Sequence, residues 1–342
     1  MPPDCPQLWA AVASVEPAIA NGCAAKSTTA SFDEYALDFR SAGNEISLTA
    51  PSCLDWRYRS CHLPHAHIEL GRDGSGNIRR GTTPGNRMQL LIQTSTEATF
   101  CRLNGQDIRT GDIAVLLPGR KFVMATNGSS EWVVASISTD ILAQIAFDIL
   151  PSDFDSDAAV VSTPPSLLRQ IKVVAGEIID SLERPSEFRG EDRAVDKASS
   201  LTNFILTGLA TGTAQVACGT PRVRGSSERA LQRALDFLDG YRNGAIVVSK
   251  LCRAAGVGER TLLRSFHDFL GMPPGHFVKL RLLNTVRRAL QSAAARGTIT
   301  SLLADYNVTE FGRFAGEYKA LFGETPSQTY SRQRAGASFP SH

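Results

Sequence analysis

Short apolar or alternating runs dominate residues 32–140, and turn residues separate them. The runs are 68–70, 88–92, 98–103, 113–117, 121–125 and 132–137. Asn104-Gly105 lies between two of these runs, and Asn-Gly is the strongest local hairpin signal because both residues tolerate positive φ. Many short strands with regular turns predict a β-sandwich or β-barrel for this part of the chain.

The apolar period changes to a helical one after residue 163. Behind Pro164-Pro165, apolar side chains recur at spacings of three or four residues: Leu168, Ile171, Val174, Ile178 and Leu182. This spacing predicts a helix that ends before Pro185, and residues 191–209 predict a second one. The apolar faces of these helices either pair two subunits or cover their own domain.

Residues 218–227, CGTPRVRGSS, are rich in Gly, Pro and Ser and predict an interdomain linker. A helix from Arg229 to Leu238 follows, and Ser249 is the predicted cap of a short helix over residues 250–255. Gly256 lies in a turn, and the next helix directs Leu262, Phe266 and Leu270 inward. This order predicts a helix-turn-helix, and Arg260 and Arg264, four residues apart, share its outer face.

The helix-turn-helix pattern recurs about forty-five residues later. Pro273-Pro274 opens a long helix that spaces the two patterns, and an aromatic stripe over residues 314–322 predicts the core of the second one. Thr325-Pro326 predicts an N-cap followed by Pro at the first helical position of a last helix. Helix-turn-helix motifs place side chains of the second helix in the DNA major groove.

The segments RTLLRSFHDFLG (260–271) and GRFAGEYKALFGETPS (312–327) resemble the AraC/XylS family of transcription regulators. The resemblance implies a seven-helix DNA-binding domain over roughly residues 228–334. It also implies which residues face the bases: Arg260, Leu263, Arg264, Gly312, Arg313 and Gly316. Residues 104–119, NGQDIRTGDIAVLLPG, resemble the cupin-like sensor barrel of the same family. The expected fold class is therefore α+β, with an N-terminal cupin-like barrel plus helices and an all-α C-terminal domain.

The chain departs from the family at the second turn. The family's helix before the second recognition helix begins with Ile-Ala and ends in Gly-Phe, whereas Leu302-Leu303-Ala304 and Asn307-Val308 stand here. Asn tolerates the left-handed conformation nearly as well as Gly, so the turn is expected to survive. The smaller Val308 is expected to pack less tightly than Phe.

Five regions are expected. Residues 1–31 form a poorly ordered start, 32–162 a cupin-like sensor domain and 163–217 a helical dimerisation segment. Residues 218–227 are the linker, and 228–335 are the DNA-binding domain with two helix-turn-helix motifs.

Charge is distributed unevenly along the chain. Residues 220–336 contain eighteen Lys and Arg against nine Asp and Glu, which is a net charge of +9. Since the whole chain carries +2, the remaining residues carry −7. A basic half joined to an acidic half is typical of a nucleic-acid binder attached to a domain that does not bind nucleic acid.

The seven cysteines contain no CxxC pair, and their number is odd. With no signal-peptide pattern at the start, reduced thiols and a cytoplasmic location are expected. No run approaches the eighteen apolar residues of a membrane span, so membrane insertion is not expected.

Two side-chain groups could carry chemistry in the N-terminal half. His65, His67 and Glu69 alternate on a predicted strand and so share one face, but a cupin metal site needs a further His and a later Glu. Ordinary surface or an effector pocket is the preferred interpretation, and neither a metal nor a cofactor is expected. Arginines, whose planar forks suit carboxylates and phosphates, could hold an anionic effector; the candidates are Arg57, Arg59, Arg79, Arg80 and Arg87.

These observations predict a sequence-specific transcription regulator, not an enzyme, controlled by a small-molecule effector in its N-terminal domain. Double-stranded promoter DNA is the expected partner, together with RNA polymerase if the protein activates, and a homodimer is expected. The alternative is a metal-dependent cupin enzyme with an accessory DNA-binding domain.

Overall fold

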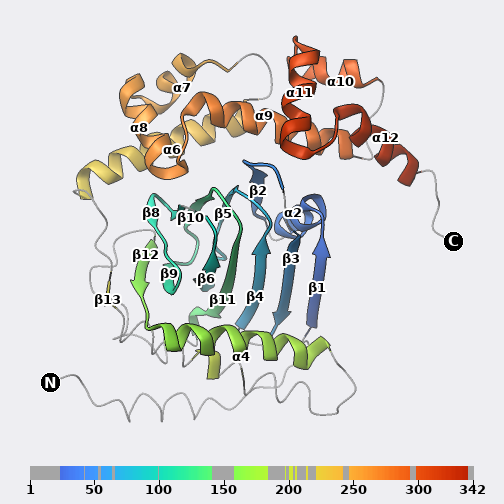
Figure 1. Ribbon diagram of the computed structural model, residues 1–342. Helices are drawn as coiled ribbons and strands as arrows, with labels where there is room; N and C mark the ends of the chain where they lie inside the picture. Colours follow the sequence, from blue (N-terminus) through green and yellow to red (C-terminus); the bar gives the residue numbers. More distant parts are fainter. Residues whose placement is uncertain are drawn as a thin grey trace. The chain divides into compact units, whose positions relative to one another are not determined.

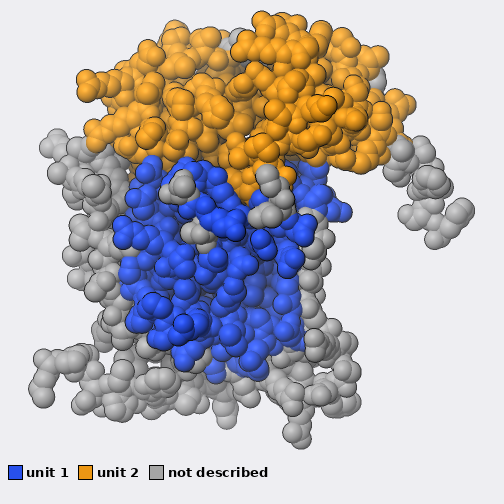
Figure 2. Space-filling view, in the orientation of Figure 1, with its two compact units in different colours: residues 1–46, 54–74, 79–217 blue, residues 47–53, 75–78, 218–342 orange. Residues whose placement is uncertain are grey.

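The structure of the protein is a computed structural model (Figure 1). The structure describes residues 24–41, 43–52, 55–63, 66–98, 100–140, 158–183, 197, 200–202, 205, 213–214, 221–241, 246–292 and 298–337. The chain divides into two compact units (Figure 2). Unit 1 comprises residues 1–46, 54–74 and 79–217, and unit 2 comprises 47–53, 75–78 and 218–342.

The N-terminal half is built on two antiparallel sheets. Sheet A has the order β1-β3-β4-β11-β6-β9-β12-β13, and sheet B has the order β2-β5-β10-β7-β8. The strands of sheet A, in that order, are Ala24–Ala30, Trp56–His62, Ala66–Asp73, Ser130–Ser138, Arg87–Thr96, Asp112–Leu116, Ala158–Ser162 and Thr213–Ala214. Those of sheet B are Glu45–Leu48, Asn77–Thr82, Lys121–Thr126, Cys101–Leu103 and Gln106–Asp107.

The strand predictions are confirmed, since each of the six predicted runs overlaps one of β4, β6, β7, β9, β10 and β11. Asn104 and Gly105 have φ of 48° and 74°, as a tight hairpin between β7 and β8 requires. The mixed α+β class is confirmed as well. The described strands, however, form two separate sheets rather than a closed barrel.

Helix α4, Pro165–Glu183, covers one face of sheet A (Figure 1). Alternate side chains of β4, β6 and β11 pack against it, and Ile171, Ala175 and Ile178 of the helix are fully buried there. Leu201 and Ile205 join the same core, although most of the predicted helix 191–209 lies outside the described residues. The apolar face of α4 therefore covers its own sheet.

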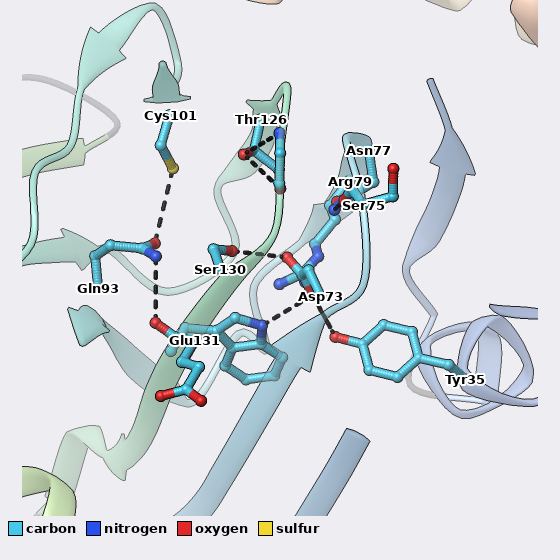
Figure 3. A network of polar contacts seen from close by, with 12 residues as sticks. Tyr35, Asp73, Ser75, Asn77, Arg79, Gln93, Cys101, Thr126, Ser130 and Glu131 are labelled. Carbon is cyan, nitrogen blue, oxygen red and sulfur yellow. Dashed lines mark hydrogen bonds and ion pairs between the residues drawn. The ribbon is translucent and has the colours of Figure 1, made fainter. Parts of the chain in front are cut away.

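A polar network lies under the opposite face of sheet A (Figure 3). Asp73 at the end of β4 accepts hydrogen bonds from the Tyr35 hydroxyl (2.7 Å), the Ser130 hydroxyl (3.1 Å) and the Trp132 indole (3.1 Å). It also forms a buried ion pair with Arg79 of β5. The partners satisfy a carboxylate that would otherwise be costly to bury.

Close packing of Trp132 explains a glycine in β4. A Cβ added at Gly71 would lie 2.1 Å from the Trp132 ring, so only Gly allows the indole to lie against the strand.

Two local expectations for the N-terminus are corrected. Ala24–Ala30, predicted to be part of a poorly ordered start, form β1 and pair with β3 over seven residues. Residues 32–41, expected among the strands, form helix α2, Phe32–Ser41. Strand β1 has no clear apolar period, so its structure depends on the neighbouring β3. Helix α2 does have a helical period, because Phe32, Tyr35, Ala36 and Phe39 recur at spacings of three and four residues, and the strand signals of the following residues concealed it.

Unit 2 contains seven described helices. They are α6 Pro221–Gly240, α7 Val248–Ala255, α8 Glu259–Leu270, α9 Pro274–Gln291, α10 Ile299–Asp305, α11 Phe311–Phe322 and α12 Pro326–Ala337. The structure differs from the predicted linker 218–227, because residues 221–227 form the first turns of α6. Proline suits the start of a helix, so Pro221 does not oppose this extension. Helix α7 also begins one residue before its predicted cap, Ser249.

Helix α9 has two buried polar residues that the apolar pattern did not predict. Asn284 donates to the Leu48 carbonyl and accepts from the Leu48 amide, both at 2.9 Å, which ties the short segment 47–53 into unit 2. Arg287 pairs with Glu324 at 3.0 Å and stacks 4.4 Å from the Phe322 ring centroid. Both residues therefore stabilise the unit internally.

Among the helices that the structure describes, none has the length and apolar character needed to cross a membrane.

Candidate DNA-binding surface

The first helix-turn-helix module consists of α7 and α8. Gly256 ends α7 with a φ of 68°, and its amide bonds to the Arg253 and Cys252 carbonyls. This left-handed conformation favours Gly and turns the chain into α8. Leu262, Phe266 and Leu270 are fully buried, and Phe266 makes an edge contact with Phe277 of α9, with 5.5 Å between the ring centroids. The predicted scaffold is confirmed.

The opposite face of α8 carries the predicted base-contacting residues. Arg260, Leu263 and Arg264 are exposed, and Leu263 keeps 45% of its surface accessible although it is apolar. Arg264 Nε lies 3.4 Å from Asp268 Oδ2, one helical turn away. An exposed pair of this kind contributes little stability, so Arg264 can exchange it for a DNA contact.

The second module consists of α10 and α11, and its turn is intact. Thr298 and Ser301 form a capping box that starts α10. Asn307 adopts a φ of 57°, the left-handed conformation predicted for this residue. Val308 is 6% exposed, so the smaller side chain still reaches the core.

Helix α11 presents its predicted residues to solvent in a different electrostatic setting. Gly312, Arg313 and Gly316 are exposed, and a Cβ at either glycine would meet nothing within 4 Å, so packing within the protein does not require glycine there. Arg313 lies 3.4 Å from Glu310 and 3.2 Å from Glu317. Hydrogen bonds and charge from Glu317 and Glu310 raise the pKa of Arg313.

Glu317 itself is shared between two cations, because Lys279 Nζ of α9 lies 2.7 Å from the carboxylate oxygen that Arg313 also approaches. Burial raises the pKa of Glu317, but hydrogen bonds and charge from Lys279 and Arg313 lower it to a net value below its ordinary range. The carboxylate is therefore ionised and holds Arg313 on the helix surface.

Sequence reasoning missed one exposed aromatic residue. Phe311, at the first turn of α11, keeps 40% of its surface accessible beside Gly312 and Arg313. Its place directly before two predicted contact residues was the available signal.

The candidate effector arginines are distributed among carboxylates. Ion pairs join Arg57 to Asp55, Arg59 to Asp180, Arg79 to Asp73 and Arg80 to Glu45, and Arg87 donates to the Ser136 carbonyl at 3.4 Å. A cavity lies between sheets A and B of unit 1, and of the five arginines only Arg79 lines it. The structure does not bring the five guanidinium groups together, and their role in effector binding stays a prediction.

The candidate metal cluster is only partly described, because His65 lies outside the described residues. His67 Nε2 lies 3.5 Å from Glu69 Oε1, and the Tyr58 hydroxyl donates to the same oxygen at 2.5 Å. Glu69 lines the cavity between the sheets instead of facing outward, so the effector-pocket alternative gains support. Within the described residues, no group of three or more His, Cys, Asp or Glu side chains could hold a metal ion.

Comparison with known proteins places the two modules in a domain family. Residues 251–332 match the family model described as a helix-turn-helix domain. The chain is 30% identical over 101 residues to a Pseudomonas putida protein named "XylDLEGF operon transcriptional activator", covering 29% of this chain and 32% of that protein. It is 33% identical over 97 residues to a Rhodococcus erythropolis "Probable thc operon regulatory protein", covering 28% and 29%.

These matches span about a third of the relatives' own length. The crystal structure of the AraC-like transcriptional activator CuxR aligns with 82% of this chain and with 100% of its own chain. The TM-score is 0.41 and the sequence identity 13%, which is too low to establish a shared fold. The family match falls on helices of unit 2. Residues 251–332 of this chain therefore form a tandem helix-turn-helix domain, similar over part of its length to proteins named as transcription regulators.

Proposed function

We propose that the whole chain is a sequence-specific DNA-binding transcription regulator in which α8 and α11 enter the major groove. The observation that carries the proposal is the exposed face of α8, where Arg260 and Arg264 stand over a fully buried core. Arginine is the commonest bidentate reader of guanine, and a rigid helix holds it in register. On α11, Arg313 donates hydrogen bonds to the DNA, and the small Gly312 and Gly316 allow the helix backbone to approach the DNA closely.

The N-terminal half is the proposed regulatory part, in which a small molecule changes how the two modules engage a promoter. Two relatives are named as a transcriptional activator and an operon regulatory protein, which supports a regulator rather than an enzyme. By the same relationship, activation through RNA polymerase is the proposed output.

Selection from a random DNA library tests the proposal with the full chain. We expect enrichment of a specific sequence, with an affinity that falls steeply as salt rises because bound phosphates release counterions. The double variant Arg260→Ala/Arg264→Ala should lose this enrichment. Arg169→Ala, which removes an exposed cation from α4, should retain it. Failure of the full chain to enrich any sequence at low salt would overturn the proposal.

A homodimer is a second proposal. Closed symmetric pairs are the commonest oligomers, and Val173, on the side of α4 that does not pack against sheet A, leaves 58% of its surface exposed although it is apolar. Light scattering of the full chain measures its mass directly. A monomer at concentrations well above those used for DNA binding would contradict this proposal.

A further inference from the structure

A cavity in unit 1 lies between sheets A and B and is bordered by α2. Its apolar lining includes Leu91 and Val134 of sheet A and Leu103 and Met124 of sheet B. The cavity has a volume of about 50 Å³. On the same scale one water needs about 10–15 Å³, so the space suits a compact organic molecule.

Hydrogen-bond acceptors in this cavity are incompletely used. The contacts of Glu69 with Tyr58 and His67 both end on Oε1, so the second carboxylate oxygen takes part in neither. Asn44 also lines the cavity, and its Oδ1 is buried without a hydrogen-bond partner among the described residues. An unpaired buried acceptor is costly, and a ligand that donates hydrogen bonds removes that cost.

The charge of the lining favours a cation over an anion. Arg79 is the cavity's cation, but its ion pair with the buried Asp73 balances its charge. Its guanidinium also lies 4.8 Å from the centroids of both the Phe39 and the Trp132 ring, so it is held against the wall. The carboxylate of Glu69 contacts only the neutral Tyr58 hydroxyl and, at 3.5 Å, His67, and neither is a permanent cation like Arg79.

Glu69 is ionised at neutral pH. Burial raises the pKa of its carboxyl group, but hydrogen bonds from His67 and Tyr58, together with the charges of His67 and Arg79, lower it to a net value below the ordinary one. The Tyr58 hydroxyl stays protonated, because burial and the Glu69 charge raise its pKa strongly. The hydroxyl therefore donates and leaves the carboxylate as acceptor.

We infer that this cavity binds a small organic amine whose protonated nitrogen donates to Glu69 and to Asn44 Oδ1. Aromatic rings of Tyr58, Phe122 and Trp132 in the lining suit a cation as well. The inference rests on the proposed function, since the amine would be the small molecule that regulates the N-terminal half. It differs from an anionic effector held by the arginines, most of which lie outside the cavity.

Three probes with the same carbon chain test the ligand class on the full protein: n-butylamine, n-butanol and butyrate. Saturation-transfer NMR and thermal unfolding should show that butylamine binds about ten-fold tighter than butyrate, with butanol between them, because a charge-assisted hydrogen bond is stronger than a neutral one. Equal or tighter binding of butyrate, or no binding of butylamine at millimolar concentration, would overturn the inference.

Variants locate the site. Glu69→Gln keeps the shape and removes the charge, so it should reduce the preference for amine over alcohol to within about two-fold. Val134→Phe fills the cavity and should abolish binding of all three probes even if Glu69→Gln is poorly folded. The control Glu177→Gln removes an exposed carboxylate of α4 and should change nothing. Amine preference that survives Glu69→Gln would contradict the site.

DNA selection without any amine separates the two proposals. Intact DNA binding combined with failed amine binding refutes only the ligand class. Loss of DNA binding with amine binding intact refutes the regulator and leaves the cavity site standing.

Discussion

The first module, α7–α8, and the second, α10–α11, have the same core design and different surfaces. In each, a left-handed residue turns the chain, Gly256 in one and Asn307 in the other, and buried apolar residues hold the recognition helix. Residues 248–270 contain four Lys and Arg against two Asp and Glu, whereas residues 299–322 contain two against three. Only the first module is basic.

The pairing of the arginines sharpens the difference. Arg264 has one carboxylate neighbour at 3.4 Å, whereas Arg313 lies between two, one of which also holds Lys279. A DNA contact by Arg313 must break these pairs and bring two carboxylates towards phosphates. Similar backbones can therefore contribute unequally to recognition, and the first module is expected to contribute more.

The largest effect is expected from Arg264→Ala. A bidentate arginine–guanine contact discriminates by about 1–3 kcal/mol, so affinity for the selected operator should fall about ten-fold or more and specificity should relax at one base pair. Binding measured on the operator and on its single-base variants would show this. If Arg264→Ala leaves specific binding intact while Arg313→Ala destroys it, the second module contributes more to recognition than the first, which contradicts the comparison.

An intermediate effect is expected at the two turns. Gly256→Ala places a side chain at a φ of 68° and should destabilise the first module by about 1–2 kcal/mol. Asn307→Ala should cost less, because the native Asn already bears part of that strain, and Asn307→Gly should relieve it. Hydrogen exchange resolved along the chain would report each module separately. A larger loss of protection from Asn307→Ala than from Gly256→Ala would contradict the comparison.

The smallest effect is expected from the surface of α11. Arg313→Ala should weaken binding by about two- to three-fold for all DNA sequences alike, as loss of a phosphate contact does. Glu310→Gln, which removes one carboxylate beside Arg313, should strengthen binding by a similar factor. Titrations on operator and nonspecific DNA would measure both. Loss of base discrimination in Arg313→Ala would show that the second module reads bases as the first does.

The sequence by itself determined the two modules, six of the strands and the exposed face of each recognition helix. These features depend on short-range rules: a helical period buries Leu262 and Phe266 and exposes Arg260 and Arg264, and Asn104-Gly105 closes a hairpin. The same rules placed Thr325 at a helix start, where its hydroxyl accepts a hydrogen bond from the backbone N–H of Gln328 at 3.3 Å. Local patterns suffice here because the interacting residues are close in the chain.

Only the tertiary structure decided which polar residues are buried and what they contact. Strand β1 has no apolar period, but it pairs along the edge of β3. Arg79, predicted as a candidate effector ligand, and Arg287 are each buried against a carboxylate and aromatic rings. Glu69 lies in a cavity because sheet A is covered on both faces, so the polar side of β4 is also internal. Burial of a charge depends on partners brought from distant strands and helices, and composition and period carry no record of those partners.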